Sequence, residues 1–410
     1  MKVVRQVYIY FGTYFFNAAL SFALVSILTR HLSPYDYGVI NLYTPFLVLL
    51  APFISGGVIY PLSVEYFKRD QKQYGQFFKN AQVIPFLSLL LFTIICIVLA
   101  RPLSNLLKVT PFWVCILPVT AWFIFTNEVS MMIARSKDKP WYFAGFSLGK
   151  NLLEIIVTLL MVLCLKWHWE GRLASASIAP VLFGLFSFYL YKKWKLLQGD
   201  VSVSMVKSIF LMSVPFIFER LSVFILSNSD RYFIDKFDLG GTKEVGFYGL
   251  GGQIASIVQI VILSVTSAYN PAIFKWLSEK RFEKAFKLVR LYLFAITFFI
   301  LLFIIGLPVV YRFFISDEFS KGQYYSTYLI VAYGFWAVYS AFLPYFLFYN
   351  EGKKVLFISI SGMVLSLLLN AILVPRIGAT GALYTSVAVY FTMAILSIFL
   401  SKPKWKLNEL

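Results

Sequence analysis

Long apolar stretches recur throughout the 410-residue chain and constrain its fold more than any other feature. Each stretch holds about 20 residues, enough for a helix to cross the hydrocarbon core of a bilayer. A lipid-embedded segment must satisfy its own backbone hydrogen bonds, so stretches of this length predict transmembrane helices. We predict twelve such helices, over residues 8–29, 38–60, 80–100, 112–133, 144–166, 173–193, 208–229, 246–268, 289–310, 326–348, 355–375 and 381–400.

The composition agrees with a protein embedded in the lipid bilayer. Hydrophobic residues make up 60% of the chain and charged residues 14%, whereas soluble proteins average about 25% charged residues. The net charge of +18 does not predict a nucleic-acid partner, because the cations flank apolar stretches and form no soluble basic domain. The three cysteines and two histidines lack the spacing of metal ligands, so we expect neither a metal site nor a cofactor. The expected fold class is an all-α polytopic membrane protein.

The distribution of cations predicts the orientation. If the N-terminus is cytoplasmic, the predicted inner segments carry roughly twice as many Lys and Arg residues as the outer loops. The positive-inside rule therefore places both termini in the cytoplasm. We expect the chain in the cytoplasmic (inner) membrane.

A faint internal repeat divides the chain into two halves. The segment RHLSPYDYG, from Arg30 to Gly38, resembles RYFIDKFDLGGTKEVG, from Arg231 to Gly246, and a proline follows each segment at a similar distance. A parallel repeat of six helices predicts a lobe over residues 1–200, a second lobe over 201–410, and a central cavity between them near the membrane midplane.

Two adjacent ionisable residues, Glu219 and Arg220, lie in the middle of the seventh predicted helix. An ionisable side chain at that depth costs about 2.5–3.5 kcal/mol on insertion scales, which favours a protein interior or a water-filled cavity over lipid. At 3.6 residues per turn, Arg220, Ser227 and Arg231 share one stripe of the helix. We predict that this stripe lines the cavity; the alternative is a structural ion pair.

The fifth predicted helix carries a second polar face, which includes Lys150, Asn151 and Glu154. Lys150 and Glu154 are spaced i,i+4 and can pair, so the face either lines the cavity or locks two helices together. Carboxylates at membrane depth often take part in proton or ion pathways, which makes Glu154 and Glu219 candidates for ion coupling. Arg30 and Arg231 occupy equivalent repeat positions near the outer surface, where the alternative is snorkelling to the interface.

Three segments resemble polysaccharide flippases. They are RHLSPYDYG in the first outer loop, SNSDRYFIDKF followed by VGFYGLGGQIA at the start of the second half, and NAILVPRIGATGA from Asn370 to Ala382. In this order, the chain resembles the Wzx-type O-antigen or polysaccharide repeat-unit flippases of the multidrug/oligosaccharidyl-lipid/polysaccharide (MOP) exporter superfamily.

The resemblance implies a MATE-like MOP fold and a transporter rather than an enzyme. The implied activity is translocation of undecaprenyl-diphosphate-linked oligosaccharide from the cytoplasmic to the outer leaflet by alternating access, for O-antigen, capsule or exopolysaccharide synthesis. A polymerase and a chain-length regulator of the same pathway are the implied protein partners. Four cations would then bind the diphosphate: Lys150 and Arg220 at mid-depth, and Arg30 and Arg231 nearer the exit.

Two other functions remain open. An ion-coupled multidrug exporter of the same superfamily would share the fold, but such proteins commonly carry an acid in the first helix, where this chain has Asn17. A membrane glycosyltransferase or polymerase would need catalytic carboxylates facing outward. Asp36, Asp235 and Asp238 lie in predicted outer loops, but no soluble domain accompanies them.

Overall fold

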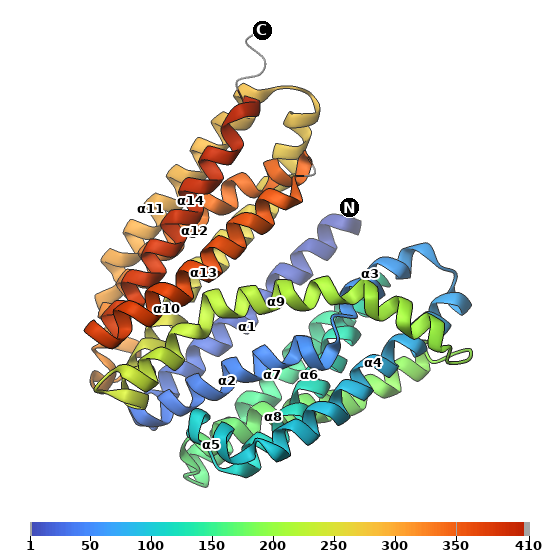
Figure 1. Cartoon of the computed structure of the whole chain (residues 1–410), viewed down its shortest axis with the longest axis horizontal. Helices are drawn as coiled ribbons and strands as arrows, with labels where there is room; N and C mark the ends of the chain where they lie inside the picture. The colour runs from blue at the N-terminus through green and yellow to red at the C-terminus, as the bar shows by residue number, and fades with distance from the viewer. Residues whose placement is uncertain (1, 350, 406–410) are drawn as a thin grey trace. The chain divides into compact units, whose positions relative to one another are not determined.

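The computed structural model describes residues 2–349 and 351–405, of which 2–7, 11, 215, 219, 267, 268 and 402–405 are described by their backbone alone. All regular elements in these ranges are helical (Figure 1). They are α1 (Lys2–Leu28), α2 (Pro34–Ser55), α3 (Ile59–Lys68), α4 (Gln71–Val98), α5 (Ala100–Leu107), α6 (Pro111–Ser136), α7 (Pro140–Leu159), a π-helical turn (Leu160–Cys164), α8 (His168–Lys193), α9 (Val203–Phe237), α10 (Gly241–Ser278), α11 (Phe282–Phe314), a 3₁₀ turn (Asp317–Phe319), α12 (Gly322–Phe348), α13 (Gly352–Ile377) and α14 (Ala379–Trp405).

Within the described residues, 12 helices are long and apolar enough to cross a membrane. This confirms the all-α, twelve-span prediction. The lengths differ in places: α9, α10 and α11 reach 35, 38 and 33 residues, because charged turns at their ends lower the hydropathy without ending the helix. The sequence-based prediction did not include α3 and α5, because these helices are too short and too polar to be recognised as membrane spans.

The chain divides into two compact units. The first comprises Met1–Leu32 and Val39–Phe224, and the second Ser33–Gly38 and Ile225–Leu410. The division falls inside α9, whose first part belongs to the first unit and whose remainder belongs to the second. The segment Ser33–Gly38 is thus separated in sequence from the unit to which it belongs.

Helix α6 is the centre of the first unit and packs against α3, α4, α5, α7 and α8. Buried aromatic and aliphatic side chains fill the space between these helices, and the Tyr191 hydroxyl donates to the Thr126 carbonyl over 2.7 Å. The connection that follows α8 is tied to α4: the fully buried Asn80 accepts a hydrogen bond from the Ser202 backbone and donates to the Asp200 carbonyl.

Helix α12 has the corresponding place in the second unit and packs against α10, α11 and α14, while α13 packs against α14. Carboxylates near the end of α9 and at the start of α2 serve the fold. Asp238 accepts a hydrogen bond from the Ala379 backbone at the start of α14 (2.7 Å), and Asp235 accepts one from the Thr242 hydroxyl (2.6 Å). At the start of α2, the Asp36 carboxylate accepts hydrogen bonds from the hydroxyl and from the backbone N–H of Ser33. These structural roles weaken the enzyme alternative, which needs carboxylates that face a substrate.

The first turn of α2 meets α10 backbone to backbone within the second unit. A Cβ atom on Gly38 would collide with the Thr242 carbonyl, and one on Gly246 would collide with the Pro34 carbonyl. These two glycines are the repeat-equivalent positions that end the two related sequence segments. Small residues permit this close approach of helices in a membrane protein.

We expect Gly38→Ala and Gly246→Ala each to destabilise the protein by about 1–3 kcal/mol, the usual cost of forcing extra atoms into a packed site. The measurement is thermal unfolding of the purified protein in detergent. Gly306→Ala in α11 is the matched control, because its added Cβ would meet nothing within 4 Å. Equal unfolding temperatures for all three variants would show that α2 and α10 can move apart to fit a Cβ atom without lowering the stability of the protein.

Candidate functional site

Two cations share one carboxylate in the first unit. Lys150 and Glu154 lie one turn apart on α7, and Arg172 approaches from the start of α8. The Arg172 guanidinium donates to Glu154 Oε1 over 2.6 Å, while Lys150 Nζ lies 3.9 Å from Oε2. Their side chains are 22%, 26% and 16% exposed for Arg172, Lys150 and Glu154, respectively. The predicted Lys150–Glu154 proximity is present, but Arg172, which the sequence did not single out, is the closer partner.

Local backbone structure brings Arg172 to this place. The π-helical turn Leu160–Cys164 ends the α7 segment, and a residue inserted in this way often marks a functional site. Gly171 sits directly on this turn, because a Cβ there would lie 3.0 Å from the Met161 Cβ. The absence of a side chain at Gly171 therefore lets the start of α8 approach α7, and the next residue is Arg172.

Neutral polar groups surround the three charges. The Asn17 amide on α1 donates to the Ser147 hydroxyl, and the Asn151 amide donates to Asn17 Oδ1, both over 2.9 Å. The Ser175 hydroxyl lies 3.2 Å from the Arg172 guanidinium and 2.6 Å from the Thr158 hydroxyl. Asn151, predicted to line the cavity, therefore joins α7 to Asn17 of α1.

Arg220 belongs to the same unit, and its side chain is exposed. It interacts electrostatically with Glu128 of α6, whose exposed carboxylate also interacts with Lys150 and Arg135. The side chain of Glu219 lies outside the described part of the chain, so its predicted role in ion coupling stays a prediction. We refer to Glu128, Lys150, Glu154, Arg172 and Arg220 as the polar cluster; it holds three cations and two acids.

The second unit holds Arg231 and Ser227, the other predicted residues of α9. Asp230, beside them, is only 8% exposed and accepts a hydrogen bond from the Tyr248 hydroxyl of α10. Arg231 interacts electrostatically with Asp230 and Tyr248, and the Ser227 hydroxyl is hydrogen-bonded to Tyr390 of α14. Arg231 is thus partly buried beside an acid that the sequence did not select.

Arg30, which the sequence repeat aligns with Arg231, has a different environment from that of Arg231. It lies in the turn after α1, where its side chain is exposed and its backbone donates to the Ile27 carbonyl. Its predicted contact with substrate stays a prediction.

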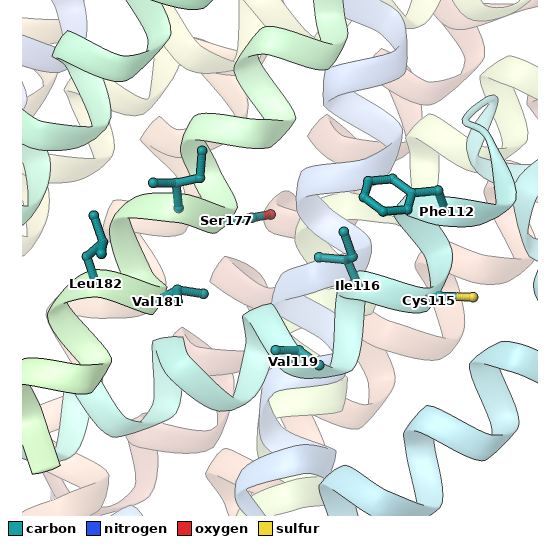
Figure 2. A pocket seen from close by; sticks show the side chains of 8 residues that line it. Phe112, Cys115, Ile116, Val119, Ser177, Val181 and Leu182 are labelled. Atoms are coloured by element: carbon teal, nitrogen blue, oxygen red, sulfur yellow. The ribbon is translucent and has the colours of Figure 1, made fainter.

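An apolar groove of about 440 Å³ lies between α6 and α8 on the first unit (Figure 2). Its lining contains no charged side chain: Phe112, Cys115, Ile116, Val119, Ser177, Ile178, Val181 and Leu182. The polar group of this lining is the Ser177 hydroxyl, which accepts a hydrogen bond from the Thr120 hydroxyl over 3.1 Å. The groove is therefore suited to hydrocarbon and differs in chemistry from the polar cluster.

Comparison with solved structures identifies the fold. An inward-facing multidrug resistance MATE family transporter of the MOP superfamily matches with a TM-score of 0.76 at 17% identity, over 96% of this chain and 95% of that one. The lipid II flippase MurJ in an inward closed conformation matches with a TM-score of 0.71 at 15% identity, over 95% and 86% of the two chains. A MOP superfamily transporter from Pyrococcus furiosus matches with a TM-score of 0.64 at 16% identity, over 100% and 96%.

Curated relatives come from Haemophilus influenzae. The Lsg locus putative protein 1 is 25% identical over 162 residues, which cover 38% of this chain and 39% of that relative. An uncharacterized membrane protein is 24% identical over 295 residues, or 68% and 67% of the two chains.

Family models complete the identification. The MatE model matches residues 215–372. The model described as polysaccharide biosynthesis protein matches residues 3–277, more than half of the chain. The chain therefore belongs to the polysaccharide biosynthesis protein family.

Proposed function

We propose that this protein is a flippase that moves undecaprenyl-diphosphate-linked oligosaccharide from the cytoplasmic to the outer leaflet by alternating access. The observation that carries the proposal is the polar cluster, in which Lys150, Arg172 and Arg220 outnumber Glu128 and Glu154. A diphosphate is costly to move through a low-dielectric region unless cations accompany it. Guanidinium groups match phosphate oxygens with paired donors.

The family supports a substrate of this class, because its members act in polysaccharide biosynthesis. One protein of similar fold is named a lipid II flippase. We further propose that the product feeds O-antigen, capsule or exopolysaccharide synthesis, with a polymerase and a chain-length regulator as partners in the cytoplasmic membrane.

The test is transport by the purified full-length protein in liposomes. Fluorescent undecaprenyl-diphosphate-oligosaccharide is placed in both leaflets, and the pool that an added membrane-impermeant quencher reaches is followed with time. We expect the flippase to carry lipid from the inner leaflet to the quencher, so the quenched fraction grows beyond its initial value. A quenched fraction equal to that of protein-free liposomes would refute the proposal.

The second candidate is an ion-coupled exporter of multiple drugs, favoured by the match of the MatE model to residues 215–372. Drugs of this kind that carry positive charge would meet an excess of cations in the polar cluster. The same liposomes distinguish the two functions, because an exporter would move a cationic dye along an imposed Na⁺ or proton gradient. Coupling through Glu154 or Glu219 is tested by the same gradients in Glu→Gln variants.

The direction of transport depends on the predicted orientation, with both termini in the cytoplasm. We expect single cysteines at Lys108 and Lys243 to react with a membrane-impermeant maleimide in intact cells, and single cysteines at Lys72 and Lys193 to be protected until the cells are opened. All four side chains are exposed, so burial does not produce the difference; the native cysteines are first replaced by serine. The reverse pattern would invert the topology.

A further inference from the structure

We propose that Glu154 is a built-in counter-ion that holds Arg172 and Lys150 in the empty transporter, and that the diphosphate of the substrate displaces it. The inference rests on the proposed function. It adds Arg172 as a substrate-binding residue and gives Glu154 the role of an internal competitor for the diphosphate.

Among the ion pairs within 4 Å in this cluster, one carboxylate, that of Glu154, is shared by two cations, while Glu128 acts on Lys150 only electrostatically. Glu154 makes a close contact with Arg172, at 2.6 Å, and only a distant one with Lys150, at 3.9 Å. A charge-assisted N–H···O bond normally spans about 2.7–2.9 Å, so the carboxylate does not satisfy the ammonium of Lys150 at hydrogen-bond distance. A diphosphate carries more negative charge and more acceptor oxygens than a carboxylate, so it can contact both cations at once.

The three side chains are also accessible to such a ligand. Each keeps between 16% and 26% of its side-chain surface exposed. The Ser175 hydroxyl, at 3.2 Å from the same guanidinium nitrogen, keeps Arg172 oriented when the carboxylate leaves. The Asn17, Ser147 and Asn151 groups next to the cluster are neutral, so no second acid among them competes for the cations.

Another ion pair in the first unit has the same shortest N–O distance and serves as a reference. Glu65 Oε2 lies 2.6 Å from Arg69 Nε at the end of α3, and the Arg69 guanidinium covers the Phe77 ring at 4.6 Å. That arginine is held by an aromatic ring as well as by its acid, and Lys68 lies only 3.5 Å from the same carboxyl group. Glu65 and Arg69 belong to the packing of α3 and lie on different helices from the polar cluster.

An internal competitor has a mechanistic consequence. It weakens diphosphate binding in the conformation where the cations are paired, and so it lets the substrate leave. Removing its charge should therefore tighten binding and slow release. The exchange also avoids exposing unpaired cations at membrane depth, which would be costly.

The experiment measures diphosphate affinity of the full-length protein in detergent by calorimetry, with geranyl diphosphate and inorganic pyrophosphate as probes. We expect Glu154→Gln to bind geranyl diphosphate at least about tenfold more tightly than wild type. We expect Arg172→Lys in the Glu154→Gln background to lose most of that gain, because the ammonium lacks the paired donors of a guanidinium. Glu65→Gln, which opens the reference pair, should leave the affinity unchanged.

Folding is followed by thermal unfolding, so a variant that does not fold is recognised. In that case Glu154→Ser replaces Glu154→Gln. Equal affinity of wild type and the folded Glu154 variant would overturn the counter-ion role. Tightening confined to inorganic pyrophosphate would overturn the lipid carrier as the occupant. Liposome transport distinguishes a failure of this inference from a failure of the proposed function. If the wild-type protein moves the lipid-linked oligosaccharide, but the Glu154 variants bind diphosphates with the wild-type affinity, only the counter-ion role is wrong.

Discussion

Replacing Arg220 with alanine is expected to reduce flipping of the lipid-linked oligosaccharide about thirtyfold or more, while the protein still folds in the membrane. The Arg220 side chain is exposed in this structure, and a bound diphosphate would cover it and form a hydrogen-bonded charge pair. Truncating one partner of such a pair costs about 2–5 kcal/mol of binding, and about 1.4 kcal/mol corresponds to a factor of ten. Arg220→Lys should recover part of the activity, because it keeps the charge and loses the paired donors. The measurement is the initial rate of transport in liposomes, beside thermal unfolding of the same preparations.

Glu128 offers a competing explanation for such a loss, because it interacts electrostatically with Arg220. If Arg220 only neutralises this acid, Arg220→Ala leaves an uncompensated carboxylate, and the added change Glu128→Gln should restore transport. Restored transport in the double variant would make Arg220 a structural residue. Under the binding hypothesis the double variant stays inactive. The same combination with Glu154→Gln tests the other acid of the polar cluster.

Replacing Asp230 with alanine should destabilise the second unit by about 3–5 kcal/mol, the usual cost of breaking a buried charge pair by removing one partner. Asp230 is 8% exposed, accepts a hydrogen bond from the Tyr248 hydroxyl and interacts electrostatically with Arg231. Its loss would remove one hydrogen-bond acceptor from the buried Tyr248 hydroxyl and the neighbouring negative charge from Arg231. Asp230→Asn should cost less, because the amide oxygen still accepts a hydrogen bond.

Thermal unfolding in detergent measures this effect. Asp317→Ala is the matched control, because Asp317 lies in an exposed 3₁₀ turn of the same unit. We expect the control to unfold near the wild-type temperature and Asp230→Ala to unfold well below it. Identical temperatures for the two alanine variants would mean that the Asp230 carboxylate makes no net contribution to the fold.

Much of the fold was predictable from hydropathy, because a lipid-embedded helix has to be both long and apolar. The same signal fails for α3 and α5, which are 10 and 8 residues long. Ile59–Lys68 begins inside the predicted second span and then turns polar, so a sliding window merges its first residues with the preceding helix. The close approach of Gly38 and Gly246 was visible only as two aligned glycines, since nothing in the sequence says that their helices touch.

The candidate site was predictable where its residues share one helix. Helical periodicity places Lys150 and Glu154 on one face, and the structure has them 3.9 Å apart. Arg172 and Glu128 come from other helices, and their relation to α7 depends on packing that no local pattern encodes. Helical periodicity places Asp230 on a stripe with Glu219, beside that of Arg220. The sequence does not say which neighbouring helix that stripe meets, so the hydrogen bond of Asp230 to Tyr248 was not predictable.

The assignment of Ser33–Gly38 to the second unit has a consequence for biosynthesis. The ribosome completes this segment long before it reaches Thr242 and Gly246. In the finished protein the segment packs against the backbone of these two residues. At about 5–20 residues per second, the roughly 200 intervening residues take on the order of 10–40 s to translate. During that interval the start of α2 has no α10 to pack against. A nascent chain stalled before residue 242 should therefore leave the backbone around Gly38 open to proteolysis, and a chain released after residue 278 should protect it.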